Sequence, residues 1–248
     1  MTHVTFSDLR TAAYCPRKLY YARHADDREP PPGVAAVRDL ATRYDSLLAA
    51  TDEALADEPI ELEPSVYRAR LCRTRDRLTN AAEETRFQPP PDRDHEATAV
   101  DGNRWKATCD PSTVDALVTG RECRGIVHKV LTDPLEPALV SAGNPPPPPD
   151  RGVWKPQRVH AVAAAKALAW THEQRVGGAW LEYPAYGEIR YVPMTTRRKA
   201  EYRRALRTVR ELDGPPPRLS NREKCTACEY ADTCGVRTRS LRSLLGFG

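Results

Sequence analysis

Apolar residues recur at helical spacing in four stretches of the chain, and they predict amphipathic helices over residues 7–25, 34–55, 157–174 and 195–212. Pro16 falls inside the first stretch, where a proline kinks a helix or begins a new turn. The last of these helices is expected to bury one side and expose the other. Its apolar side comprises Tyr202, Ala205, Leu206, Val209 and Leu212.

Runs of alternating or consecutive apolar and β-branched residues predict strands between these helices. The predicted strands span residues 60–70, 97–106, 114–118, 125–131, 138–141, 179–183 and 188–192. Proline-rich stretches at residues 88–94 and 144–150 predict loops. This order of elements predicts an α/β (α+β) fold with a mixed central sheet flanked by helices.

Composition excludes several classes of protein. Hydrophobic residues make up 40% of the 248 positions and charged residues 29%, with a mean hydropathy of −0.63. No apolar run approaches the length of about 18 residues that a membrane-spanning helix needs, and no basic-then-apolar leader begins the chain. A cytoplasmic protein with no membrane partner is expected. Thiols stay reduced in the cytoplasm, so clustered cysteines there indicate metal binding rather than disulfides.

Arginine dominates the basic residues, because only seven of the 38 lysines and arginines are lysine. Codon usage in a GC-rich genome produces the same bias, so the placement of the arginines is more informative than their number. They cluster at residues 68–77, at 237–242 and on the polar side of the last predicted helix. That side comprises Arg197, Arg198, Arg203, Arg204, Arg207 and Arg210. Because arginine binds phosphate bidentately, these clusters favour DNA as a partner over a merely solvated surface.

Three of the seven cysteines lie close together near the C-terminus, as Cys225-x-x-Cys228 followed by Cys234. Three thiolates in a polar loop are typical of a zinc or iron–sulfur site, but a fourth ligand is missing. Cys15 is the candidate, because the following Pro16 lacks a backbone donor and a Cys-Pro step recurs at iron–sulfur ligands. The remaining three cysteines are interpreted as small buried or half-buried hydrophobic residues. They are Cys72, Cys109 and Cys123.

The segment from Tyr14 to Tyr21, read as Y-C-P-R-K-L-Y-Y, together with the C-terminal trio resembles the CRISPR-associated Cas-four exonucleases. These are RecB-like nucleases of the PD-(D/E)xK superfamily. The resemblance implies a restriction-endonuclease-like core whose ends are joined by a 4Fe–4S cluster on Cys15, Cys225, Cys228 and Cys234. It implies one domain in three parts: a helical part (1–58), the core (59–213) and the cluster-binding segment (214–248). Zinc is the alternative metal.

The catalytic positions of that family are altered in this chain. The family uses a Gly-x-x-Asp strand, a Glu-x-Lys strand and a glutamine on the next helix to hold Mg²⁺ or Mn²⁺ and activate water. The matching positions here are His128, Leu139, Ser141 and, near the glutamine, His160. The family's early histidine has no counterpart, since Tyr44 and Asp45 lie there. Leucine and serine cannot replace a carboxylate and an ammonium, so a degenerate catalytic centre is predicted.

The predicted function is therefore a DNA-binding accessory or scaffold protein in CRISPR adaptation, an antiviral defence, or in DNA repair, built on a nuclease fold with an iron–sulfur cluster. One alternative is an active metal-dependent single-stranded DNA exonuclease with displaced acidic residues, for which Glu122, Asp133 and Glu136 are candidates. Mg²⁺ or Mn²⁺ is a cofactor only in that case. The other alternative is a zinc-stapled protein-interaction module with no nucleic-acid role.

Overall fold

A computed structural model describes residues 3–25, 31–80, 104–147 and 152–235 of the chain. Six strands form one mixed sheet in the order β1-β3-β4-β5-β6, with β2 also paired to β3. The strands are β1 (Val4–Thr5), β2 (Thr113–Thr119), β3 (Cys123–Leu131), β4 (Glu136–Val140), β5 (Gly178–Tyr183) and β6 (Glu188–Pro193). A mixed sheet flanked by helices confirms the predicted α/β class.

Strand β3 is the centre of the sheet. It pairs antiparallel with β2 along one edge, and its other edge pairs with β1 at its start and with β4 at its end. Strands β4 and β5 run parallel, which requires a crossover between them. Helix α8 (Lys155–Thr171) provides that crossover and packs back onto the sheet.

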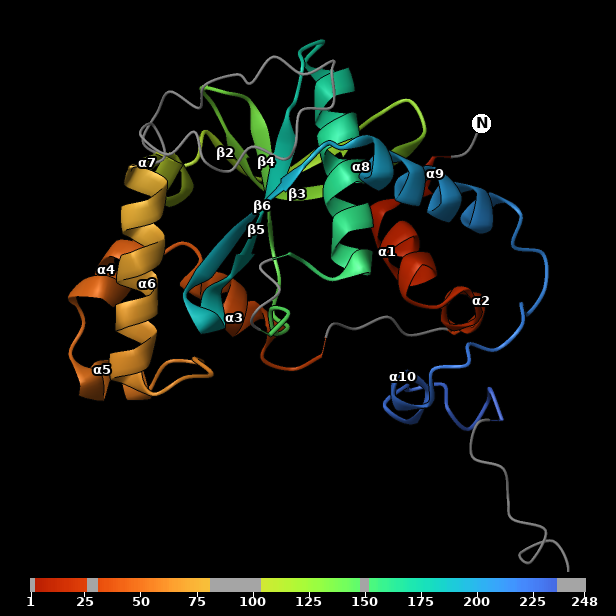
Figure 1. Cartoon of the computed structure of the whole chain (residues 1–248), viewed down its shortest axis with the longest axis horizontal. Helices are drawn as coiled ribbons and strands as arrows, with labels where there is room; N and C mark the ends of the chain where they lie inside the picture. The colour runs from red at the N-terminus through yellow and green to blue at the C-terminus, as the bar shows by residue number, and fades with distance from the viewer. Residues whose placement is uncertain (1–2, 26–30, 81–103, 148–151, 236–248) are drawn as a thin grey trace, which may run out of the picture.

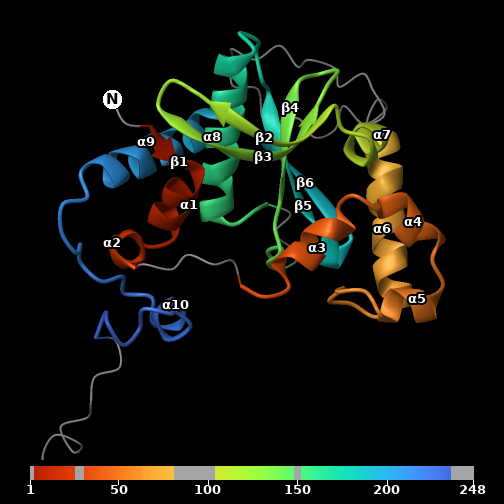
Figure 2. The same ribbon diagram turned by 180° about the vertical axis from the view of Figure 1, so that it is seen from behind.

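Three helices cover one face of the sheet, as Figures 1 and 2 show. They are α1 (Phe6–Tyr14), α8 and α9 (Thr196–Arg210), with α2 (Pro16–His24) following α1 directly. The alanine-rich middle of α8 lets neighbouring elements approach closely: a Cβ on Gly120 would lie 2.7 Å from Ala167 Cα. Phe6 at the start of α1 packs similarly onto Gly125 of β3, where a Cβ would lie 2.3 Å from the ring. These contacts position α1 and α8 against β3.

A second helical layer covers the other face at the end of the sheet that contains β4, β5 and β6 (Figure 1). It is formed by α3 (Val34–Leu40), α4 (Tyr44–Ala49), α5 (Asp52–Ala56), α6 (Pro64–Thr79) and α7 (Arg104–Cys109). Many of its contacts with the sheet are apolar: Tyr67 and Leu71 of α6 and Trp105 of α7 pack with Ile189 and Trp180 of the sheet.

One predicted strand is wrong, and the described end of a second is helical. Residues 64–79 form helix α6, whose buried positions Tyr67, Leu71, Thr74 and Leu78 are spaced for a helix. Pro64 occupies the first helical position, where its fixed φ angle favours a helix start. The described end of the predicted strand 97–106 begins helix α7, and the rest of that stretch lies outside the described residues.

Other boundaries are also corrected. The predicted helix 34–55 is three short helices, α3, α4 and α5, and the predicted helix 7–25 is interrupted at Cys15, as Pro16 indicated. The remaining strands and the last two long helices are confirmed within a few residues. The loop at 88–94 lies outside the described residues, as do the arginines of 237–242 and part of the loop at 144–150. No helix in the described ranges is long and apolar enough to cross a membrane.

Candidate cysteine site and nuclease-like centre

Cys15 lies at the junction of α1 and α2, where the backbone is extended (φ −159°, ψ 115°). Its Sγ caps α2 by accepting a hydrogen bond from the backbone N of Lys18 at 3.5 Å. Pro16 takes the first helical position of α2 and so ends the α1 pattern. The break that Pro16 imposes therefore presents Cys15 at the start of α2.

The C-terminal cysteines are held in a series of tight turns. Cys225 lies in the short helix α10 (Arg222–Thr226), and the side chain of Asn221 caps that helix. The backbone N of Cys228 donates to the carbonyl of Cys225 at 3.2 Å, and the N of Cys234 donates to the carbonyl of Tyr230 at 2.8 Å. These turns direct the three thiols to one cavity.

Cys15 lines the same small cavity as the three C-terminal cysteines, although about two hundred positions separate them along the chain. Contacts around the cavity join α2 to the C-terminal segment: Lys18 forms an ion pair with Glu229 at 3.2 Å, and the Arg17 guanidinium donates to the carbonyl of Pro216 at 2.9 Å. The rings of Tyr21 and Tyr230 stack at 6.0 Å. Both ribbon views place α10 and its turns next to α2 (Figures 1 and 2).

Basic residues are among those that line the cavity. They are Arg17, Lys18, Arg218 and Lys224. The pKa of Arg17 is raised, first by its hydrogen bond to Tyr21 and also by Cys234. The pKa of Tyr14 is raised, first by burial and also by the nearby cysteines. Four thiols that line one cavity are a donor set that fits a thiolate-bound metal group.

The described residues contain no group of three or more His, Cys, Asp or Glu side chains that converges closely enough to hold a single metal ion. In a 4Fe–4S cluster each thiolate binds a different iron, so the ligands surround a cavity rather than one point. The other cysteines lie elsewhere: Cys123 is buried in the core, Cys72 is on α6 and Cys109 is on α7.

The positions that the family resemblance compares with a nuclease's catalytic residues, here called the nuclease-like centre, lie where β3 meets β4. The register pairs Lys129 with Ala138, which sets His128 opposite Leu139. The backbone N of Val140 donates to Nδ1 of His128 at 3.2 Å, so Nε2 of that ring carries the proton. Leu139 is 1% exposed. These two positions offer no oxygen ligand for a hard cation.

Ser141 follows β4 and bonds to a residue that the sequence interpretation missed. Its Oγ accepts a hydrogen bond from Nε2 of Gln157 at 3.0 Å. The Oε1 atom of Gln157 accepts from the Tyr183 hydroxyl at 2.6 Å and from the backbone N of Trp154 at 3.2 Å. Gln157, rather than His160, is therefore the α8 residue in contact with the Ser141 position. The sequence could have indicated Gln157, because it is a glutamine one helical turn before His160 on the same predicted helix.

His160 lies on α8 against α1. Its ring is tilted against Phe6 with centroids 5.6 Å apart, and its Nε2 is buried without a hydrogen-bond partner among the described residues. Burial lowers the pKa of His160 to about 3 and the pKa of His128 to about 4. Both imidazoles are consequently neutral at pH 7.

The acidic residues considered as displaced ligands are engaged elsewhere or distant from His128 in the fold. Both carboxylate oxygens of Glu136 accept hydrogen bonds at 2.6 Å, one from Trp180 Nε1 and the other from the Tyr191 hydroxyl. Glu122 lies 3.6 Å from Arg210 and 3.4 Å from the Tyr202 hydroxyl. Asp133 lies in the turn between β3 and β4, beyond the end of β3.

The six arginines of α9 that were predicted to contact DNA fall into two groups. Three are engaged: Arg197 is 3.9 Å from Glu201, Arg210 is 3.6 Å from Glu122, and Arg198 is half-buried and donates to the carbonyl of Pro193. The other three are exposed and have no carboxylate partner in the described part of the chain. They are Arg203, Arg204 and Arg207. The expected apolar side is confirmed, with Tyr202, Ala205, Leu206 and Val209 buried.

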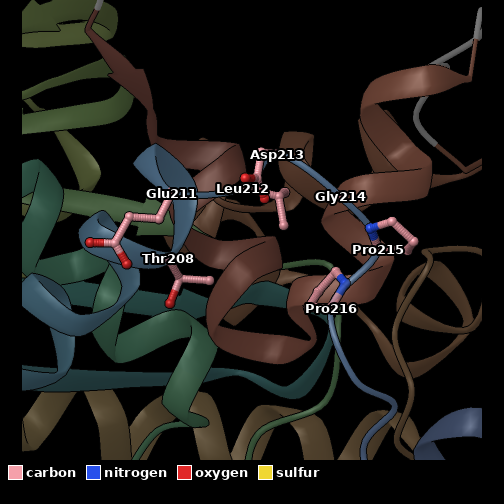
Figure 3. Close-up of a pocket in the computed structure, with 7 residues that line it drawn as sticks. All are labelled: Thr208, Glu211, Leu212, Asp213, Gly214, Pro215 and Pro216. Carbon is pink, nitrogen blue, oxygen red and sulfur yellow. The ribbon is translucent and has the colours of Figure 1, made fainter.

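The cluster at 68–77 is less available. Arg68 pairs with Asp52 at 2.7 Å, Arg75 pairs with Asp76 at 2.9 Å, and Arg77 donates to the carbonyl of Ile189. A hollow at the end of α9 is lined by Thr208 and by residues 211–216, and Figure 3 shows its Glu211 and Asp213 carboxylates. Its lining includes no cysteine, histidine or arginine, so it belongs to neither the cysteine site nor the nuclease-like centre.

The fold and these sites define a mixed α/β protein in which the junction of α1 and α2 meets the C-terminal cysteine turns at one cavity. Comparisons with protein-family models and with curated proteins found no match for this chain.

Proposed function

We propose that this protein is a DNA-binding accessory or scaffold protein, acting in CRISPR adaptation or DNA repair, in which Cys15, Cys225, Cys228 and Cys234 hold a 4Fe–4S cluster. The observation that carries the proposal is the shared cavity of these four cysteines. When bound, the cluster would supply four metal–thiolate bonds that staple the chain ends together. The surrounding cations would offset the negative charge of the thiolates.

The nucleic-acid part of the proposal is supported by α9. Arg203, Arg204 and Arg207 project from its exposed side without carboxylate partners among the described residues. Tyr202 and Val209 anchor the same helix in the core, so the guanidinium groups stand on a rigid element. Contacts of this kind neutralise phosphates independently of base sequence.

The accessory role is supported by the residues at the nuclease-like centre. His128, Leu139 and Ser141 lack the carboxylates and the lysine that metal-dependent hydrolysis of DNA requires. Glu136, which lies on β4 together with Leu139, already accepts two hydrogen bonds at 2.6 Å. A protein of this kind would bind DNA without cleaving it.

The cluster is tested by anaerobic purification of the full chain. We expect brown protein with broad absorption at about 400 nm and about four irons and four sulfides per chain. Cys15→Ala should lose the colour as fully as Cys228→Ala, whereas Cys72→Ala, which changes a cysteine outside the cavity, should keep it. Colourless protein that contains one zinc per chain would contradict the cluster assignment and support zinc as the bound metal.

The accessory role is tested with labelled single-stranded DNA and Mn²⁺. We expect binding without degradation. Mn²⁺-dependent degradation that disappears in Asp115→Asn, which removes the carboxylate acting on His128, would show instead that the centre is active. If the chain neither degrades nor binds DNA, the alternative of a zinc-stapled protein-interaction module remains.

A further inference from the structure

An apolar patch lies on the hairpin that β2 and β3 form. Leu117 of β2 and Ile126 of β3 are direct partners across the two strands, and they are 69% and 51% exposed. Val114, three residues before Leu117, is 57% exposed. A single exposed apolar side chain is normal on a protein surface, but three on two paired strands indicate an interaction surface. These three residues are called the apolar patch below.

The apolar patch lies on the face of the sheet opposite α1 and α8. Gly125 packs against Phe6 of α1, and successive residues of a strand point to opposite faces, so Ile126 points away from α1. The second helical layer covers this face farther along, where Leu131 of β3 is buried in the core that the layer shares with the sheet. In Figure 2 the hairpin lies in front of α8. The exposure of Leu117 and Ile126 shows that no described segment covers them.

Two charged residues lie symmetrically about the Leu117–Ile126 pair. Arg124 is two residues before Ile126 on β3, and Asp115 is two residues before Leu117 on β2. Because the strands are antiparallel, Arg124 and Asp115 lie at similar distances on opposite sides of the pair. Both are exposed, and neither forms an ion pair within the ranges that the structure describes. The surface is therefore basic at one end and acidic at the other.

We propose that the apolar patch is the contact surface of a symmetric dimer of this chain. A two-fold axis through the Leu117–Ile126 pair would bring the two patches together and place Arg124 of one copy next to Asp115 of the other. A two-fold interface needs this self-complementarity, because the same surface serves both copies. A partner of one charge would leave Arg124 or Asp115 facing a like charge, so a second copy fits better. The surface contains no residue of the proposed function and does not depend on it.

The dimer should be weak. Stable interfaces bury about 800 Å² on each partner, and the three side chains of the apolar patch supply only part of that area. Exposed ion pairs add little affinity, so Arg124 and Asp115 would orient the two copies while the apolar side chains hold them together. Association is therefore expected to increase with protein concentration and to reverse on dilution.

The test is sedimentation velocity of the full chain over a wide range of protein concentrations, where we expect a reversible monomer–dimer equilibrium. Leu117→Ser removes the side chain from both halves of the interface. It should weaken dimerisation about hundredfold, since the burial of each leucine contributes about tenfold. Val114→Ser should also weaken the dimer. The matched control is Val66→Ser, which changes a 45% exposed valine on α6 and should dimerise as the unchanged chain does.

Charge reversal tests the orientation of the two copies. Arg124→Glu would place a carboxylate next to Asp115 of the other copy and should weaken the dimer about tenfold. Adding Asp115→Asn should restore part of the association, because it removes the repulsion and asparagine tolerates the positive φ angle of 47° at this position. Normal dimerisation of Leu117→Ser, or of Arg124→Glu, in chains with unchanged circular dichroism would overturn the proposal.

A chain that stays monomeric at every concentration would also overturn the proposal. The binding of a hydrophobic dye then distinguishes the other occupants of the patch. If Leu117→Ser binds less dye than the unchanged chain, the patch is open to a different protein. If both bind dye equally, another segment of the same chain covers it.

Discussion

Nζ of Lys129 lies 2.8 Å from Oε2 of Glu182, and neither side chain is more than 3% exposed. The pair joins β3 to β5 across β4, on the side of the sheet covered by the second helical layer. Lys129 also donates to the carbonyls of Ala41 at 2.7 Å and Thr108 at 2.9 Å, and the Tyr44 hydroxyl donates to the same carboxylate oxygen at 2.9 Å. Each charge is therefore compensated by the other, and hydrogen bonds to the second helical layer satisfy Lys129 Nζ and Glu182 Oε2.

Removing one member of this pair should be strongly destabilising. Lys129→Met leaves the Glu182 carboxylate buried without its counter-ion, which typically costs about 3–5 kcal/mol. Urea denaturation should show the loss as a lower midpoint with an unchanged slope. The double variant Lys129→Met/Glu182→Leu should recover much of the stability, because no unpaired charge remains. A double variant no more stable than Lys129→Met would contradict this explanation.

Stability should fall as the pH decreases from about 6.5, the pKa of an unperturbed histidine, towards 4. Burial lowers the pKa of His128 to about 4 and that of His160 to about 3, so the unfolded chain binds protons in this range that the folded chain does not. Each group then reduces the free energy of unfolding by up to about 1.4 kcal/mol per pH unit, and the full stability is present above pH 6.5.

The measurement is urea unfolding at several pH values between 7.5 and 4.5, chosen at about half-unit steps. His160→Leu removes one of the two groups and should make the decline between pH 6.5 and 4 shallower by up to that amount. If the pH curves of the variant and the unchanged chain are parallel, the pKa of His160 is the same in the folded and the unfolded chain, which would contradict the prediction.

DNA affinity should depend on Arg203, Arg204 and Arg207. For single-stranded DNA each lost phosphate contact reduces the slope of log affinity against log salt by about 0.7, so the triple change to glutamine should reduce it by about 2. The control is a triple glutamine variant of three exposed arginines outside α9, which should keep the slope. They are Arg121, Arg124 and Arg175. Equal slopes for both triple variants would argue against α9 as the DNA-binding surface.

The docking of the C-terminal segment should depend more on Tyr230 than on Glu229. Tyr230 stacks on Tyr21 with ring planes 24° apart, whereas Glu229 is 62% exposed in its ion pair with Lys18. An aromatic pair contributes about 0.5–1.5 kcal/mol beyond burial, and exposed ion pairs contribute about 0–1 kcal/mol. Trypsin should therefore cut after Arg218 or Lys224 several-fold faster in Tyr230→Ala than in Glu229→Gln. The reverse order would assign the docking to the ion pair.

The sequence predicted best those elements whose pattern was strongest. Helices α8 and α9 and strands β2 to β6 follow from helical or alternating patterns of apolar residues. Helix α6 was missed because its few buried residues, such as Tyr67 and Leu71, are separated by arginines that also fit an alternating pattern. The resemblance identified the Ser141 position but not its contact with Gln157, since that hydrogen bond joins the end of β4 to α8.

What the sequence by itself determined is local: apolar periodicity, the helix break at Pro16, and the close spacing of Cys225, Cys228 and Cys234. These features depend on residues a few positions apart, where backbone geometry alone relates the side chains. Only the tertiary structure decided that Cys15 shares their cavity, that Lys129 is paired inside the protein, and which arginines of α9 remain exposed. The reason is physical, because charge pairing and burial between distant segments are set by how the helices pack on the sheet.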